Sequence, residues 1–366
     1  MGIEARPWPN VAIPPGVTLA EAIDALGISQ AELARRAGRP VQAIGEIIQG
    51  RKEITAETAI ELERVVGIPV HVWVRLEADY RTAKAMLADR HRLAEEIPFA
   101  RRCPYGEMTK LGWLPETGDA IERVGHLLGF FGVASLSNLS AAAAWRKSDA
   151  LTPDECALAA WLRKGELEAQ EVDVQEFDPD GLAAAFAVIR GFTRESPAQF
   201  GQKLKRMLSG LGVALVFVPH LKKTGAHGAT RWLGRKAVVQ LSVRFSWADI
   251  FWFTLFHELS HLLLHGKKGM FINFLKDHRD KYEREADAHA GDLLIPPALY
   301  ARFLAKCERH RFLPGHEIVE FAADIGIHPG IVVGRLQHDK KLKPQILNEL
   351  RQQYRLRGPT EDSTTA

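Results

Sequence analysis

The sequence contains few cysteines, and their spacing excludes two kinds of site. Among 366 residues only Cys103, Cys156 and Cys307 are cysteines, and no two of them form a Cys-x-x-Cys pair. A disulfide framework and a thiolate zinc knuckle are therefore excluded. Since such a framework is missing, we expect the protein to occupy a reducing compartment.

Long apolar runs free of charge are absent as well. The longest apolar stretch, residues 247–265, is interrupted by ionisable side chains, namely Asp249, His257, Glu258, His261 and His265. Ionisable groups at these depths argue against a membrane span. Residues 1–16 lack a basic region followed by an apolar core, so we predict no secretory signal. We therefore expect a cytoplasmic protein that makes no membrane contact.

A strong excess of one charge is also missing. The chain has 48 basic and 45 acidic residues and a net charge of +3, which excludes a general affinity for nucleic acid. Its length suits two or three globular domains. The charge is unevenly distributed, because no acidic residue lies between Glu195 and Asp249, whereas nine basic residues do.

The N-terminal part carries the start and stop signals of four short helices. Ser29 with Glu32 and Thr18 with Glu21 have the spacing of capping boxes. A glycine follows each short periodic run, at Gly27, Gly38, Gly50 and Gly67. These signals predict helices over 18–26, 29–37, 40–49 and 55–66. Two short helices joined by a tight glycine turn are typical of a helix-turn-helix motif.

Several polar side chains of this motif could contact DNA. Around the presumed recognition helix, Arg39, Val41 and Gln42 could reach base edges, and Arg51 and Lys52 suit phosphate contacts; Gln30 completes the predicted set. However, residues 1–81 hold nine basic and eleven acidic residues, and the recognition helix is largely apolar. A helical protein-interaction module without DNA affinity is therefore an alternative.

The second half of the chain combines strand and helix signals. Residues 212–219 form a β-branched apolar run that predicts a buried strand. The segments 229–233 and 236–243 are separated by Gly234-Arg235, which suits a type II′ hairpin. Ser246 and Asp249 are expected to cap a helix that runs to His265, and a further helix spans 281–295.

The helix over 247–265 carries the pattern His-Glu-x-x-His. His257 and His261 lie four residues apart and therefore share one helix face, where both could bind one zinc ion. Glu258 could reach a water molecule without being a ligand. A catalytic zinc takes a third protein ligand, for which we expect Glu283, with Glu285 in reserve. Asp287 is expected to accept a hydrogen bond from one of the histidine rings and thereby to fix the tautomer of that ring.

This set of residues predicts peptide hydrolysis. Zinc would lower the pKa of a bound water, and Glu258 would take its proton and deliver it to the leaving amine. Arg231 and Tyr282 are candidates for the oxyanion donor. We expect the hairpin residues Thr230, Arg231 and Trp232 to lie at the sheet edge and bind an extended substrate strand. The alternative is an ordinary structural hairpin.

Several segments of the second half resemble the ImmA/IrrE family of metallo-endopeptidases. They are WFTLFHELSHLLLHG, EREADAHAGDLLIPP, ATRWLGRKAVVQLS and, near the C-terminus, FAADIGIHPGIVVGRLQHD. The resemblance implies a zincin-like α+β domain that cuts a helix-turn-helix repressor, with His257, His261 and Glu283 as ligands and Glu258 as base. Ser260 stands where the family usually has glycine, and Asp287 and His289 where it often has asparagine and phenylalanine.

The N-terminal segments ISQAELARRAG, ITAETAIELERVVGIP and VWVRLEADY resemble HigA-type antitoxins, a branch of the Cro/cI-like helix-turn-helix regulators. This resemblance covers about residues 8–81 and implies a DNA-binding, dimeric regulator.

Together these observations predict a mainly α protein with a small α+β part. We expect a helix-turn-helix domain at 1–81, a helical connecting region at 82–180, a zinc peptidase domain with a small sheet at 181–300, a helical extension at 301–354 and a disordered tail at 355–366. The predicted protein binds a DNA operator, forms a homodimer, and cleaves a partner such as a repressor or toxin. Two alternatives are a non-catalytic repressor or antitoxin whose metal domain senses or sequesters a partner, and a zinc hydrolase acting on a small molecule.

Overall fold

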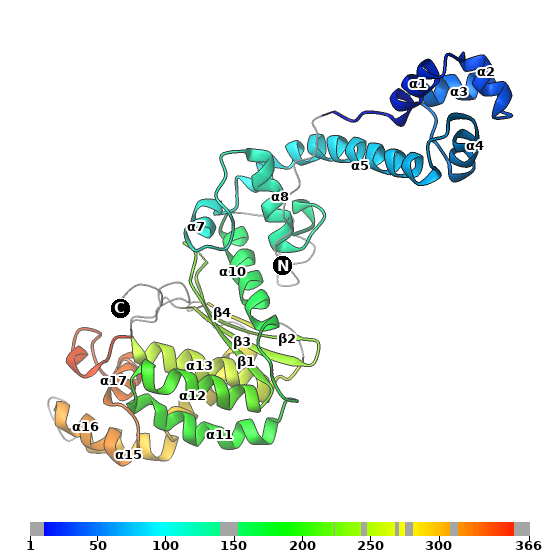
Figure 1. The fold of residues 1–366 in the computed structure, drawn as a ribbon. Helices are drawn as coiled ribbons and strands as arrows, with labels where there is room; N and C mark the ends of the chain where they lie inside the picture. Colours follow the sequence, from blue (N-terminus) through cyan, green and yellow to red (C-terminus); the bar gives the residue numbers. More distant parts are fainter. Residues whose placement is uncertain are drawn as a thin grey trace, which may run out of the picture. The chain divides into compact units, whose positions relative to one another are not determined.

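The chain forms two compact units (Figure 1). The computed structural model describes residues 11–139, 153–222, 224–242, 247–267, 271–274, 281–307 and 314–354. The first unit comprises Met1–Ile97 and Asp119–Gly125, and the second comprises Pro98–Gly118 and His126–Ala366. The predicted capping residue Ser246 and the predicted tail lie outside the described residues. None of the helices in the described ranges is long and apolar enough to cross a membrane.

Five helices build the first unit: α1 (Pro15–Ala25), α2 (Gln30–Arg36), α3 (Val41–Ile48), α4 (Ala56–Val66) and α5 (Val70–Glu95). Ser29 caps α2, because its hydroxyl accepts a hydrogen bond from the Glu32 amide at 3.2 Å. The predicted cap at Thr18 is wrong. Pro14 and Pro15 start α1 three residues earlier, since proline suits the first helical position.

The core of the first unit fixes the position of α3. Leu33, Ile44, Leu62 and Trp73 are fully buried and belong to one apolar cluster. Gly16 lets α1 approach α3 closely, because a Cβ at this position would lie 2.1 Å from the carbonyl oxygen of Ile47. The helix that is predicted to contact DNA therefore packs tightly against the core of the first unit.

The second unit is built around a four-stranded sheet of order β1-β3-β2-β4. Its strands are β1 (Val213–Val218), β2 (Ala226–Leu233), β3 (Lys236–Ser242) and β4 (Phe271–Phe274). β1 is parallel to β3, and β2 is antiparallel to both of its neighbours. The predicted hairpin between β2 and β3 is confirmed, and Gly234 has the positive φ, +61°, that a type II′ turn requires at its first position.

Helices cover both faces of this sheet (Figure 1). α10 (Pro153–Gln170) packs on the face that carries Ala214, Val216 and Val238. α12 (Pro197–Gly210) and α13 (Ala248–Leu264) pack on the other face, whose core includes Leu215 and Val239. Successive strand residues point to opposite faces, so the apolar run of β1 serves both layers.

The remaining helices belong to the second unit, except that α6 and α8 begin within the first unit. They are α6 (Ile97–Ala100), α7 (Tyr105–Lys110), α8 (Ala120–Phe131), α11 (Pro179–Gly191), α14 (Lys281–Leu294), α15 (Pro297–Cys307), α16 (Gly315–Asp324) and α17 (Pro329–His338), with short 3-10 turns at Leu136–Asn138, Phe192–Arg194 and Asn348–Leu350. A disulfide joins Cys103, before α7, to Cys156 on α10. This pair runs against the expectation from the sequence of a reducing compartment without disulfides, and no local pattern could have predicted it, because 53 residues separate its members.

The last described residues hold the start of α13 in place. Arg351 forms a bidentate ion pair with Asp249, with hydrogen bonds of 3.1 and 2.8 Å, and both side chains are about nine-tenths buried. Trp252 donates its indole N–H to the Tyr354 hydroxyl at 2.8 Å. The helix that carries the His-Glu-x-x-His pattern is thus fixed from its N-terminal end.

Candidate metal centre and DNA-binding surface

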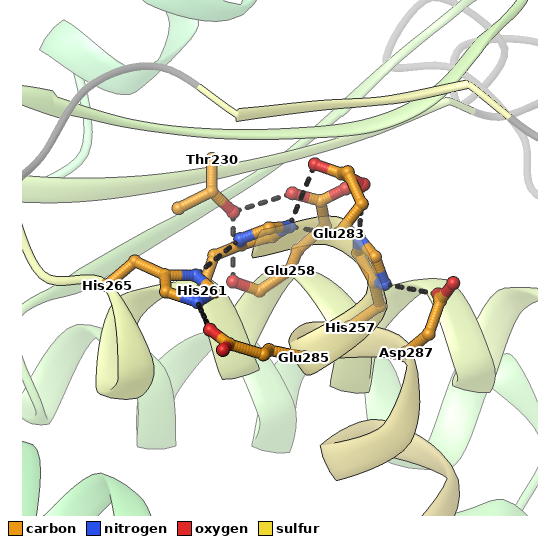
Figure 2. Close-up of polar contacts among 8 residues, drawn as sticks. All are labelled: Thr230, His257, Glu258, His261, His265, Glu283, Glu285 and Asp287. Atoms are coloured by element: carbon orange, nitrogen blue, oxygen red, sulfur yellow. Dashed lines mark hydrogen bonds and ion pairs between the residues drawn. The ribbon is translucent and has the colours of Figure 1, made fainter. Parts of the chain in front are cut away.

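Three potential metal ligands converge between α13 and α14. His257 and His261 lie one turn apart on α13, and Glu283 reaches them from the first turn of α14 (Figure 2). The two Nε2 atoms are 3.0 Å apart, and they lie 3.1 and 3.3 Å from the carboxylate oxygens of Glu283. Ligands bonded to a tetrahedral zinc at 2.0–2.1 Å are about 3.3 Å from one another. The spacing and the donor types therefore fit a zinc ion.

Small residues make this convergence possible. Ala286 and Ala290 on α14 are buried and let α14 approach α13 closely.

Carboxylates and a further histidine orient the two imidazoles. His257 donates from Nδ1 to Asp287 at 2.8 Å, which leaves its Nε2 directed at Glu283. His261 Nδ1 lies 2.9 Å from His265 Nδ1, and His265 Nε2 lies 3.2 Å from Glu285. Figure 2 shows Asp287 and Glu285 on opposite sides of the histidine pair. Glu285, the reserve candidate, thus contacts His265 and not the convergent nitrogens.

Glu258 lies beside these three residues and is completely buried. The Thr230 hydroxyl on β2 donates to Glu258, with Oγ1 2.7 Å from Oε2 and 2.9 Å from the main-chain oxygen (Figure 2). Oε1 has no hydrogen-bond partner among the described residues. A Cβ on Gly228 would lie 2.3 Å from Oε1, so glycine is needed there. The sequence analysis missed Gly228, although a glycine within a strand often marks such a close approach.

The surroundings shift the pKa values of these groups strongly in the metal-free chain. Burial raises the pKa of Glu258 to about 8, although His257 and Thr230 oppose the shift. Burial alone would lower the pKa of His257, but the hydrogen bonds to Asp287 and Glu283 raise it to about 10. Burial would raise the pKa of Glu283, but its bonds to the two histidines lower it to about 2. Such shifts concentrate at functional sites.

The sequence placed Thr230, Arg231 and Trp232 at a free sheet edge, and for Thr230 this prediction is wrong. β2 lies inside the sheet, where Thr230 pairs with Val239 of β3 and with Phe271 of β4. The short strand β4, which follows α13, occupies the expected substrate position along this part of β2.

Arg231 is also unsuited to the role of oxyanion donor. Neighbouring strand residues point to opposite faces, so Arg231 faces α10 while Thr230 faces Glu258. Its guanidinium donates to the main-chain oxygen of Leu162 at 2.6 Å and lies 3.6 Å from Glu166. The other candidate, Tyr282, packs against His265, with ring centroids 4.8 Å apart.

The residues predicted to contact DNA have different environments in the first unit. Val41 and Gln42 are exposed at the start of α3, as are Gln30, Arg51 and Lys52 near the ends of neighbouring segments. Gln42 donates to Glu46 at 2.9 Å, and the Arg51 guanidinium contacts the side chain of Gln49. Arg39 is partly buried and pairs with Glu61 of α4 at 2.5 Å, so it also helps to hold the domain together.

Two family matches cover separate parts of the chain. Residues 19–73 match the helix-turn-helix family, and residues 221–336 match the IrrE N-terminal-like domain of peptidase family M78. The second match extends through α17, and no curated protein matches the chain.

Two solved antitoxin structures are similar to about a quarter of the chain. A HigA-family addiction module antidote protein from Coxiella burnetii is 29% identical and aligns over 23% of this chain and 94% of its own, with a TM-score of 0.22. The Pseudomonas aeruginosa antitoxin HigA with the higBA promoter is also 29% identical over 24% of this chain and 95% of its own, with the same TM-score. The two family models thus identify one region similar to the helix-turn-helix family and one region similar to the IrrE N-terminal-like domain.

Proposed function

We propose that the second unit is a zinc-dependent endopeptidase that hydrolyses a peptide bond in a partner regulatory protein. The observation that carries this proposal is the convergence of His257, His261 and Glu283 beside the buried carboxylate of Glu258. Three protein donors leave one coordination position for water or substrate, as catalytic zinc sites require. Glu285 has no place in this set, since it pairs with His265.

The chain's own residues supply proton transfer and orientation. A bound zinc ion would supply Lewis-acid chemistry that activates water and polarises a carbonyl group. Glu258 is the proposed general base, because it lies beside the three candidate ligands (Figure 2) and its Oε1 has no partner among the described residues. Thr230 holds the other oxygen, and Asp287 fixes the orientation of His257. Glu258 would take a proton from the attacking water molecule and deliver it to the leaving amine.

The first unit is proposed to bring this activity to DNA in the cytoplasm. Gln30, Val41 and Gln42 would contact the operator, together with Arg39, Arg51 and Lys52, and the unit would form a homodimer there. The match to the helix-turn-helix family supports DNA binding. A repressor or a toxin regulated from the same operator is the proposed substrate.

Metal analysis tests the ligand set directly. Purified wild-type protein is expected to bind one zinc ion, whereas Glu283→Ala loses it and Glu285→Ala, a matched change two residues away on α14, retains it. Loss of zinc from Glu285→Ala but not from Glu283→Ala would show that the proposed third ligand is wrong.

Cleavage of a peptide library, read by mass spectrometry, tests the chemistry. Glu258→Gln is expected to abolish cleavage and to keep zinc, because the amide preserves the shape of the side chain but cannot accept the proton. If this variant regulates its target in cells as well as the wild type does, the non-catalytic repressor or antitoxin becomes the better description.

A further inference from the structure

A pocket of about 620 Å³ opens beside the candidate metal centre, within the second unit. Three helices form its walls, namely α13, α14 and α17, and His227 of β2 joins them. Glu283 and Asp287 line the pocket near the histidine pair, whereas Asp249 lies about two helical turns before His257 on α13. The pocket therefore begins at the candidate metal ligands and extends along α13 away from them.

The walls of the pocket are mainly apolar. They include Ile250 and Phe253 of α13, Leu294 and Ile295 at the end of α14, and Ile331 of α17. A volume of this size is typical of pockets for small ligands or large side chains. Its occupant is therefore expected to bury apolar surface.

Three of the charged side chains along the pocket have ion-pair partners within the protein, whereas Arg284, also in the lining, is exposed to solvent. Asp249 pairs with Arg351 at 2.8 Å, and Asp287 accepts from His257 at 2.8 Å. Arg335 of α17 pairs with Asp339 at 2.8 Å. Since these groups have partners, a charged occupant would have to compete with them, whereas an apolar occupant would leave them undisturbed.

Glycine at two positions of the pocket wall leaves space for these ion pairs. A Cβ on Gly291 would lie 2.2 Å from a guanidinium nitrogen of Arg335, and a Cβ on Gly334 would lie 2.4 Å from Asp249 Oδ2. The helices thus have room for the ion pairs only because glycine stands at both positions. This arrangement keeps the apolar part of the pocket open.

We propose that this pocket binds a large aliphatic or aromatic side chain next to the scissile bond, and thereby selects the cleavage site. The inference rests on the proposed peptidase function. Glu283 belongs both to the candidate ligand set and to the pocket wall. A substrate whose carbonyl lies at the metal centre would therefore have an adjacent side chain within reach of the pocket.

The test uses metal-chelating probes that need no turnover. The hydroxamates of N-acetylleucine, N-acetylphenylalanine and N-acetylglycine are titrated into the zinc-loaded full chain, and each dissociation constant is measured by calorimetry. The leucine and phenylalanine probes are expected to bind at least about tenfold more tightly than the glycine probe, because each buries a large apolar side chain.

Two matched variants locate this preference. Ala288 is exposed on the pocket wall, and Ala301 is exposed on α15 outside it. Ala288→Phe is expected to fill the pocket and reduce the preference to about twofold or less, with unchanged affinity for the glycine probe. Ala301→Phe is expected to retain the full preference.

The outcomes separate this inference from the proposed function. If the apolar probes bind preferentially but the wild type cleaves no peptide, the peptidase proposal fails, and with it the selection of a cleavage site, whereas the binding of an apolar group by the pocket stands. If peptides are cleaved without an apolar preference, or the three probes bind equally or not at all, the pocket assignment is overturned. A preference that survives in Ala288→Phe also overturns it.

Discussion

Thr230 on β2 holds Glu258 on α13, with the threonine hydroxyl 2.7 Å from the carboxylate oxygen Oε2. The contact joins the sheet to the helix that carries two of the candidate metal ligands, and it occupies one oxygen of the proposed base. The other oxygen, Oε1, is left beside Gly228. Glu258 is fully buried, and these two strand residues lie against its two carboxylate oxygens.

Thr230→Val should weaken cleavage and shift its pH dependence. The hydrogen bond from Thr230 lowers the pKa of Glu258 against the effect of burial, so its loss raises this pKa further and moves the acidic limb of the pH–rate profile to higher pH. The variant should also lose about 1–3 kcal/mol of unfolding free energy.

A second buried threonine provides the control. Thr224 donates to the main-chain oxygen of Leu221 at 2.9 Å, outside the candidate site. Thr224→Val should lower stability without moving the pH profile. If the pH–rate profile of Thr230→Val is not shifted, Thr230 does not influence the pKa of Glu258.

Gly228→Ala should abolish cleavage while zinc binding persists. The added Cβ would lie 2.3 Å from Glu258 Oε1 and 2.7 Å from its Cγ, so the carboxylate must move in a fully packed interior. We expect a loss of about 1–3 kcal/mol in unfolding free energy. Gly201→Ala on α12 is the matched control, because its Cβ would meet no atom within 4 Å. Full activity in Gly228→Ala would contradict the proposed position of the base.

Local signals in the sequence predicted much of the fold and of the ligand set. Ser29 caps α2 and Gly234 sets the hairpin turn through interactions within a few residues. His257 and His261 share a helix face because of helical periodicity alone. These features depend little on the rest of the fold, so the sequence was sufficient to place them.

Features that depend on packing between distant segments could not be predicted. Glu283 and Glu285 differ by more than half a helical turn, and only the packing of α14 on α13 decides which one faces the histidine pair. The interior position of β2 depends on β4, four residues that pair with it from beyond α13. The apolar pocket requires three helices, and no sequence spacing encodes that arrangement.

Glu258→Gln should stabilise the metal-free protein increasingly as the pH rises. The pKa of this carboxyl is about 8 in the folded chain and 4.5 in an ordinary environment. Between these values the unfolded chain releases the proton and the folded chain keeps it, so wild-type stability falls as the pH rises through this window. Glutamine does not titrate, so the unfolding free energy of the variant should exceed that of the wild type at high pH. The difference should reach a few kcal/mol, which is the order of magnitude that corresponds to a pKa shift of this size.

Denaturant unfolding with a chelator, at several values between pH 5 and pH 9, measures this advantage. Glu285→Gln is the control, because the hydrogen bond to His265 lowers the pKa of Glu285, and a lowered carboxyl pKa affects stability only at acid pH. Its difference from the wild type should stay constant over the range. A constant difference for Glu258→Gln as well would show that the carboxyl titrates normally.

The first unit allows a test of DNA recognition that separates specificity from general affinity. Gln42 is exposed at the start of α3, where a side chain can reach base edges. Gln42→Ala should therefore weaken binding to the operator by about 1–3 kcal/mol and leave binding to random DNA unchanged. Arg51→Ala should weaken binding to operator and random DNA equally. It should also reduce the salt dependence of binding by about the contribution of one phosphate contact.

Arg39 and Arg64 complete the set of variants. Arg39 pairs with Glu61, so Arg39→Ala should lower the stability of the unit by up to about 1 kcal/mol in addition to any loss of operator affinity. Arg64, exposed in the last turn of α4, should tolerate alanine without a change in binding. Fluorescence anisotropy with operator and random duplexes at two salt concentrations distinguishes these cases. Equal losses on both duplexes for Gln42→Ala would place α3 outside the major groove, because a side chain that reads base edges must discriminate between sequences.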